Sequence, residues 1–194
     1  MALRPSADTQ WALALAALLL ATLASLHLMG QPWWCQQGDL APWSSEVDSV
    51  HNSQHLVDPY TLTHVLHGFG FYAILWTVLG RRGSRFSQRD RFVVAMAAEG
   101  AWEVFENTDF VIQRYRDYTI SLDYFGDSVL NSLGDMTAAA IGYGAAMTLP
   151  LWASVAAFAG IEALLLLWIR DSLLLNMLML AWPLDAVANW QSGG

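Results

Sequence analysis

Three glutamates lie on one face of an otherwise apolar segment, residues 92–112. At about 100° per residue, Glu99, Glu103 and Glu106 fall within about 60° of one another on a helix. Carboxyl groups in an apolar setting must be hydrogen-bonded, paired or bound to a cation, because the bare charge is costly to bury. A buried carboxyl group can also serve as a general base near neutral pH. The stripe therefore indicates acid–base or metal chemistry.

Two further apolar segments carry side chains that could complete such a site. His64 and His67 are spaced i, i+3, while Asp127 and Asp135 stand two turns apart, within about 80° on one helix face. Two imidazoles with a carboxylate suit zinc or iron, whereas several carboxylates suit magnesium, calcium or manganese. We predict His64, His67 and Asp127 as ligands of a divalent metal, with Asp135 as a fourth.

The remaining roles of such a site fall to residues at the end of the glutamate segment. Glu103 or Glu106 would be the general base that takes a proton from metal-bound water. Arg114 or Arg116 could hold a phosphate or a developing negative charge. Equally, these arginines could serve only as anchors at the level of the lipid headgroups.

The composition indicates the environment in which these groups lie. Of 194 residues, 55% are hydrophobic and only 13% are charged, against about 25% charged in soluble domains. All nine basic residues are arginine, and the formal net charge of -8 offers no basic face for nucleic acid. The chain is predicted to be an integral membrane protein whose environment is the lipid bilayer.

The apolar runs predict an all-α membrane domain covering residues 1–194. About 20 apolar residues cross the hydrocarbon core, which gives a bundle of about five transmembrane helices. The predicted spans are residues 11–28, 61–80, 92–112, 127–149 and 151–169. Residues 173–184 are short for a span and predict an interfacial or re-entrant helix, with a sixth, tilted helix as the alternative.

The arginines indicate the orientation. Five of them lie in the loop 81–91, and arginine-rich loops stay in the cytoplasm. This places the N-terminus inside, on an uncleaved first helix, and the long loop 31–60 outside. It also puts His67, Glu106 and Asp135 at similar depths, about 9 to 12 Å below the outer surface. Cys35, the single cysteine, can form no intramolecular disulfide and is expected to be structurally incidental.

The chain resembles a bacterial inner-membrane family known as uncharacterised protein family 0314, or domain of unknown function 2585. The resemblance covers nearly the whole chain and rests on His55–Gly68, Glu99–Asn107, Arg114–Arg116, Ser121–Ser128 with Asn131 and Asp135, Arg170–Asp171 with Asn176, and Trp190–Gln191. It implies a multi-pass protein of the cell inner membrane and brings no reaction with it. A fainter similarity links Asp58, His64, Glu103, Asp127 and Asn131 to VanZ-like membrane proteins, although Pro59 stands where that family has a lysine.

Three functions fit these residues. The first is a metal-dependent hydrolase or transferase that acts at the outer leaflet on a lipid or lipid-linked substrate. The second is a non-catalytic membrane subunit or assembly protein, whose polar network joins helices or holds a pigment between His27 and His64 or His67. The third is a proton or ion pathway through Glu99, Glu103 and Glu106. Whether the protein is an enzyme stays open at this point, and no protein partner is indicated.

Overall fold

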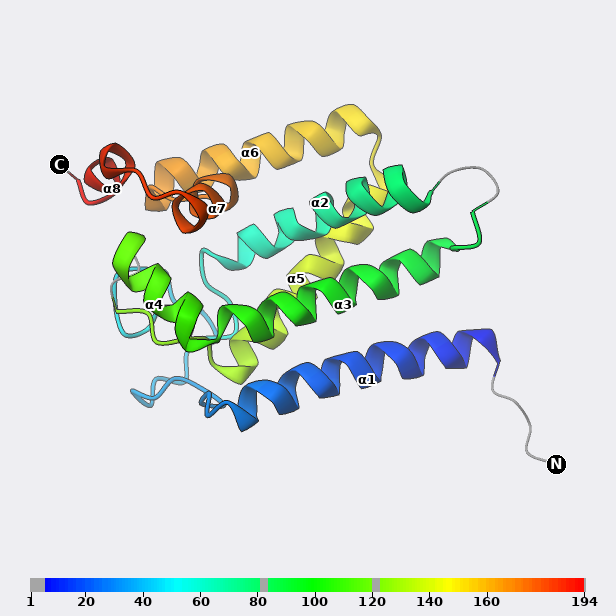
Figure 1. Cartoon of the computed structure of the whole chain (residues 1–194), viewed down its shortest axis with the longest axis horizontal. Coiled ribbons are helices and arrows are strands. Elements are labelled where there is room, and N and C mark those ends of the chain that lie inside the picture. The colour runs from blue at the N-terminus through cyan, green and yellow to red at the C-terminus, as the bar shows by residue number, and fades with distance from the viewer. Residues whose placement is uncertain (1–5, 81–83, 120–122, 194) are drawn as a thin grey trace.

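The computed structural model describes residues 6–80, 84–119 and 123–193, and the elements within these ranges are helices (Figure 1). They are α1 (Ala7–Leu28), α2 (Thr61–Leu79), α3 (Gln88–Glu106), α4 (Asp109–Tyr118), α5 (Val129–Thr148), α6 (Leu151–Ile169), α7 (Leu173–Ala181) and α8 (Asp185–Gln191). In the described ranges, extended backbone pairs only as one isolated bridge between Trp43 and Val57. The predicted all-α class is confirmed.

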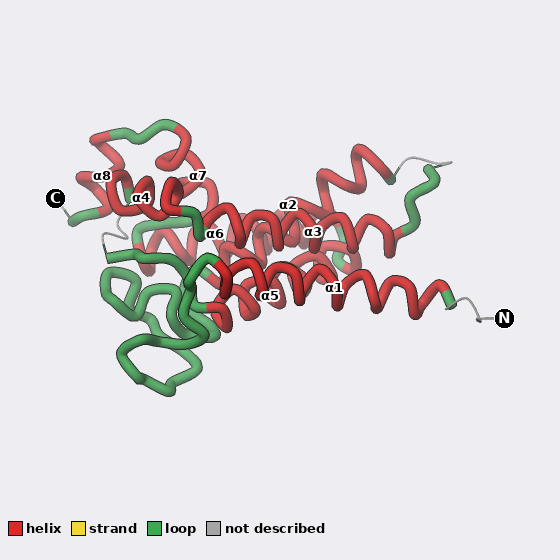
Figure 2. Tube along the Cα trace, turned by 60° about the horizontal axis from the view of Figure 1, so that its bottom comes forward, coloured by secondary structure: helices red, strands yellow, loops and turns green. Residues whose placement is uncertain are grey.

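The five longer helices run back and forth along one direction (Figure 1). The end of α2, the beginning of α3 and the α5–α6 turn lie at one end of the bundle. The connection 29–60, the short helices α4, α7 and α8, and the beginnings of α2 and α5 gather at the other end (Figures 1 and 2). This end contains nearly all of the irregular backbone, as the predicted outer loop requires.

Within the described ranges, three helices are long and apolar enough to cross a membrane, namely α1, α2 and α6. The boundaries of α2 and α6 agree with the predicted segments, because Gly80 follows α2 and Pro150 precedes α6, whereas α1 begins at Ala7, before the predicted segment 11–28. Helices α3 and α5 have similar lengths, 19 and 20 residues, but carry the polar residues that lower their hydropathy. Arg81 and Arg82 of the predicted cytoplasmic loop lie outside the described residues.

The predicted helix 92–112 is wrong in its extent, because α3 ends at Glu106 and Asn107 is its C-terminal cap. The Asn107 side chain donates to the Glu103 carbonyl at 2.9 Å and to Asp127 Oδ2 at 2.7 Å. An asparagine amide that satisfies the last turn in this way competes with continued helix. Thr108 then adopts extended angles and α4 begins at Asp109, which turns Arg114 and Arg116 away from the axis of α3.

Two other predicted boundaries also shift. Ser128 caps α5 by accepting from the backbone of Asn131, so Asp127 precedes the helix instead of beginning it. The predicted helix 173–184 ends at Ala181, and a second short helix, α8, follows from Asp185. Pro183 stands between the two helices and interrupts the backbone hydrogen bonding.

Helices α2 and α5 approach each other most closely where glycines face backbone. A Cβ on Gly68 would lie 2.2 Å from the Ala139 carbonyl oxygen, and one on Gly142 would lie 2.0 Å from that of Val65. Small residues allow such contact between membrane helices. Gly70, two residues along α2, has open space around it and lines a cavity instead.

Candidate metal and acid–base site

One carboxylate holds both histidines of α2. Glu99 Oε1 lies 2.6 Å from His64 Nδ1, and Glu99 Oε2 lies 3.0 Å from His67 Nδ1. Glu99 and His64 are buried, and the His67 side chain is 14% exposed. A carboxylate that accepts from Nδ1 fixes the ring orientation and leaves the lone pair on Nε2. The arrangement therefore presents two imidazole nitrogens in fixed directions.

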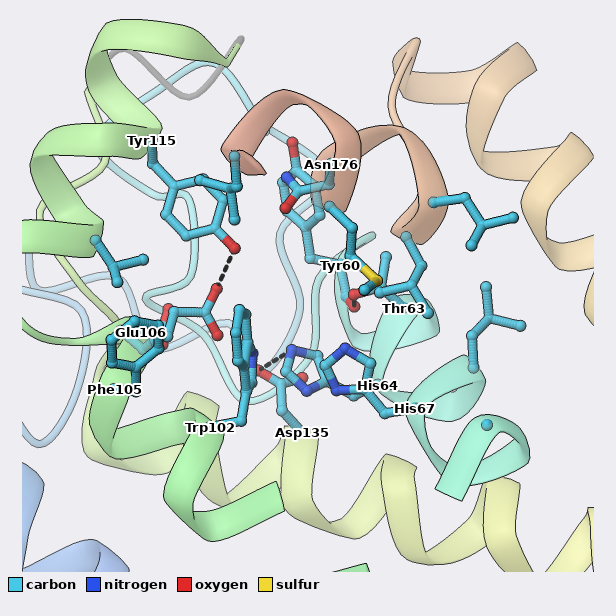
Figure 3. Close-up of a pocket in the computed structure, with 18 of the residues that line it drawn as sticks. Tyr60, Thr63, His64, His67, Trp102, Phe105, Glu106, Tyr115, Asp135 and Asn176 are labelled. Atoms are coloured by element: carbon cyan, nitrogen blue, oxygen red, sulfur yellow. Dashed lines mark hydrogen bonds and ion pairs between the residues drawn. The ribbon is translucent and has the colours of Figure 1, made fainter. Parts of the chain in front are cut away.

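A second acid lies on the other side of His64. Asp135 Oδ2, from α5, is 3.8 Å from His64 Nε2, while Glu103 Oε1 lies 3.3 Å from Nδ1. The Nδ1 atom has a single proton, and it donates this proton in the shorter of the two contacts, the hydrogen bond to Glu99. Figure 3 shows His64, His67 and Asp135 together on the polar wall of one cavity. The predicted association of acids and histidines from α2, α3 and α5 is thus present.

Several buried carboxyl oxygens here accept no hydrogen bond. They are both oxygens of Glu103, Oε2 of Glu106 and Oδ1 of Asp135. His64, Glu103 and Glu106 can also bring one ligand atom each within 4.8 Å of the others, as can His64, His67 and Glu99. Buried carboxylates without donors are costly, and a cation is one of the few groups that can satisfy several at once.

Glu106 differs from Glu103 in facing the cavity. Its Oε1 accepts a hydrogen bond from Tyr115 OH at 2.7 Å, across the break between α3 and α4 (Figure 3). Glu103 is fully buried and does not line the cavity. Of the two predicted bases, Glu106 is therefore the one that a substrate or a water in the cavity can reach.

Asp127 lines the same cavity, but protein donors already occupy it. Asn107 Nδ2 donates to Oδ2 at 2.7 Å and Tyr124 OH donates to Oδ1 at 3.0 Å. The Asp127 backbone N–H in turn donates to Asn107 Oδ1 at 2.7 Å. These bonds connect the end of α3 to the beginning of α5.

Next to this connection, Asn131 of α5 binds the segment that leads into α2. Its side chain donates to the His55 carbonyl at 2.7 Å and to Asp58 Oδ2 at 3.3 Å. Burial, with the nearby charge of Asp127, raises the pKa of Asp58 from its ordinary value to about 6. The segment before α2 is thereby held against α5 close to the cavity.

The cavity has a volume of about 1110 Å³ and its wall is mostly apolar. Part of its lining consists of apolar side chains that are 49% to 67% exposed: Ile74, Phe105, Phe110, Leu174 and Met177. Arg114 reaches the cavity from α4, where its Nε donates to the Leu180 carbonyl at 2.6 Å and its guanidinium lies over the Tyr118 ring. Arg116 is exposed and does not line the cavity.

Neither Glu99 nor Tyr115 is predicted from the sequence as a partner of the histidines or of Glu106. Glu99 was recognised in the glutamate stripe, but spacing alone does not show which glutamate faces the histidines. Tyr115 meets Glu106 only because the chain turns at Asn107. The His27 ring lies 5.5 Å from the Trp33 ring, and within the described residues it belongs to no group that could hold a metal.

Comparisons with known proteins agree on the family. The family model described as protein of unknown function (DUF2585) matches residues 26–193. The UPF0314 protein of Paracoccus denitrificans is 49% identical, with 91% of each chain covered, and that of Rhizobium meliloti is 48% identical over 94% of this chain and 91% of the relative. No solved structure matches. The predicted resemblance to family 0314 is confirmed, whereas the similarity to VanZ-like proteins is not shown.

Proposed function

We propose that this chain, which belongs to the DUF2585 family, is a metal-dependent hydrolase or transferase of the bacterial inner membrane. Its substrate would be a lipid or lipid-linked phosphate. Relatives of the same family occur in bacteria, and three helices are apolar enough to span a bilayer. In this proposal α3 and α5 also cross the membrane, with their acids turned toward the cavity.

The proposal of a metal site rests on the Glu99 carboxylate, which accepts hydrogen bonds from both histidines. Because Glu99 accepts from Nδ1 of His64 and of His67, both Nε2 lone pairs remain available. Asp135 lies 3.8 Å from His64 Nε2 and would complete a set of two histidines and one carboxylate after a rearrangement of side chains, because His64, His67 and Asp135 do not bring three ligand atoms within 4.8 Å of one another in this structure. That set suits zinc or iron and leaves positions open for water and substrate. Asp127 is left out of the ligand set because Asn107 and Tyr124 already hold it.

The lining of the cavity supports a lipid-like substrate. Exposed apolar side chains such as Phe110 and Met177 line one part, and the histidines and acids line another. A molecule with hydrocarbon chains and a polar head fits this division, with its chains at the apolar part. Arg114 lines the cavity on the side of α4, where its guanidinium would bind a phosphate head.

The chemistry would be the hydrolysis or transfer of a phosphate ester. A cation held by the histidines would supply polarisation of the attacking water and offset charge on the phosphoryl oxygens. Glu106 takes the proton of the water as its oxygen forms a bond to phosphorus. The bond from phosphorus to the lipid oxygen breaks, and the proton held by Glu106 passes to that oxygen. In a transferase, an alcohol would replace the water.

The test uses the full chain, purified in detergent, with elemental analysis and phosphate release from a phosphatidic acid and an isoprenyl diphosphate. His67→Gln and Asp135→Asn should each lose one equivalent of metal and the activity. Glu106→Gln should keep the metal and lose at least about 100-fold in rate, the usual range for removal of a general base. His27→Gln, a histidine outside the cavity, is the matched control and should change neither.

The competing function is a polar network that only joins helices. It is favoured by the short contact between His64 and Glu99, which would stabilise the α2–α3 interface without any metal. In that case the cavity variants lower thermal stability, but the metal content of wild type and His67→Gln is the same. That result, or phosphate release by Glu106→Gln at the wild-type rate, would overturn the proposal.

A further inference from the structure

A second cluster of metal-ligating side chains lies in the connection between α1 and α2, away from the histidines of the cavity. Cys35 Sγ is 3.5 Å from His51 Nδ1, and His51 Nδ1 is 3.2 Å from His55 Nε2. The ligand atoms of the three residues all lie within 4.8 Å of one another. Cys35 and His55 are buried and His51 is partly exposed. One sulfur and two imidazole nitrogens thus converge on a small volume.

Two of the three separations match edges of a tetrahedral zinc site, and the third is within 4.8 Å. Zinc binds sulfur at about 2.3 Å and histidine nitrogen at about 2.0–2.1 Å. At the tetrahedral angle these bonds put sulfur and nitrogen about 3.6 Å apart and two nitrogens about 3.4 Å apart. The observed separations, 3.5 Å and 3.2 Å, are close to both values. An ion could therefore be bound with little movement of the side chains.

The surroundings fix the histidine in the form that a metal needs. His55 Nδ1 lies 2.6 Å from the Ala41 carbonyl oxygen, and only an N–H can satisfy that contact. The lone pair is therefore on Nε2, the atom that faces His51. In zinc-bound histidines, the ring nitrogen that does not bind the metal commonly donates a hydrogen bond to a backbone carbonyl. The edge of the Trp34 ring also lies against His55, with ring centres 6.0 Å apart.

The backbone holds the two halves of the cluster against the same helix. The Pro32 carbonyl, near Cys35, accepts from the Val129 backbone at 2.8 Å. The Ser53 carbonyl, between the two histidines, accepts from the Ser128 backbone at 2.9 Å. Ser53 also lines the large cavity. A metal bridge here would tie residues 32–35 to residues 51–55 and stabilise one wall of the cavity.

We propose that Cys35, His51 and His55 bind a transition-metal ion of the zinc class. A thiolate with two imidazoles selects such ions over magnesium or calcium, which prefer oxygen ligands. The fourth position faces the partly exposed side of His51, where water would bind. This site shares no ligand with the cavity site, so the proposal does not rest on the proposed function.

The test begins with full-length protein in detergent, depleted of metal by a chelator and then titrated with Co²⁺ and Zn²⁺. Cys35 is the single cysteine of the chain, so a cobalt–thiolate charge-transfer band can come only from this residue. We expect the band to saturate within two equivalents, since the cavity site can take up the other equivalent, and to disappear when Zn²⁺ is added. We also expect Zn²⁺ to slow alkylation of Cys35.

Variants connect the signal to the three residues. Cys35→Ser should abolish the band, and His51→Gln should weaken Co²⁺ binding by at least about 100-fold, since even outer partners cost 10–100-fold. His67→Gln, which removes a cavity ligand, should keep both the band and the protection, so the two proposals fail separately. Absence of the band in wild type, or equal alkylation rates with and without Zn²⁺, would overturn the proposal.

Discussion

His64 Nδ1 lies 2.6 Å from Glu99 Oε1, a buried contact that joins α2 to α3 beside the cavity. Glu99 accepts a hydrogen bond from Nδ1–H and so determines which ring nitrogen of His64 faces Asp135. The residue that orients the candidate ligands is thus neither a predicted ligand nor a predicted base. Its effect on function would be exerted through the histidines.

Replacing Glu99 tests this positioning role. Glu99→Gln keeps the shape but removes the charge, and a neutral amide can accept well from only one of the two Nδ1–H groups. We expect the metal affinity of the cavity to fall by about 10–100-fold, the range for outer partners of ligands. Competition with a chelator measures it. Asp109→Asn removes an exposed acid from α4 and is the control. Unchanged affinity in Glu99→Gln would rule out the role.

The close approach of α2 and α5 gives a test of the packing. Gly142→Ala would put a Cβ 2.0 Å from the Val65 carbonyl oxygen, a backbone atom that cannot move alone. We expect a loss of at least about 1–3 kcal/mol, as for other overpacked interiors. Gly144→Ala is the matched control on the same helix, since nothing lies within 4 Å of its Cβ. Thermal unfolding in detergent should separate the two variants, and equal unfolding temperatures would contradict this packing.

The sequence predicts the long helices well and the contacts between them poorly. Apolar runs ended by Gly80 and Pro150 fix the limits of α2 and α6, because these limits depend on local composition. The break after Glu106 depends on Asn107 binding Asp127, which is 20 residues away in the sequence. The contacts within the candidate sites likewise join residues that are far apart in the sequence.

The connection between α1 and α2 is the clearest case of a cluster that sequence spacing does not predict. Cys35 has no motif with His51 and His55, because the backbone between them is irregular and has no fixed period. Backbone bonds to the beginning of α5 bring residues 32–35 and 51–55 together. Contacts set by such long-range backbone bonds leave no spacing signal in the chain itself.

The buried carboxyl group of Asp171, between α6 and α7, should make stability depend on pH. Burial raises its pKa from the ordinary 3.8 to about 6, despite hydrogen bonds from Asn176, Ser172 and Tyr60. The folded chain therefore holds this proton more tightly than the unfolded chain. The resulting stabilisation is complete below about pH 4 and is lost as the pH rises through about 6. It amounts to about 3 kcal/mol, at 1.36 kcal/mol per unit.

Asp171→Asn should flatten this part of the pH profile, since the amide does not titrate. The readout is the change in unfolding temperature between pH 4 and pH 6, compared with wild type, rather than the absolute temperature at either pH. Asp185→Asn removes an exposed acid from α8 and should leave the profile unchanged. Parallel profiles for Asp171→Asn and wild type would contradict the shifted pKa.

The last prediction concerns the orientation in the membrane. Arg85, Arg89 and Arg91 lie at the end of the bundle opposite the connection 29–60 (Figure 1), and arginine-rich loops stay in the cytoplasm. Leu40 is 83% exposed in that connection and Ser84 is exposed next to the arginines.

In a Cys35→Ser background, Leu40→Cys should react with a membrane-impermeant thiol reagent on intact spheroplasts. Ser84→Cys should react only after lysis, and the Cys35→Ser parent should not react at all. Because α2 is the only described helix between the two positions, the pair also tests whether that helix crosses the membrane. The reverse pattern would invert the orientation, and labelling of both positions on intact spheroplasts would show that α2 does not span.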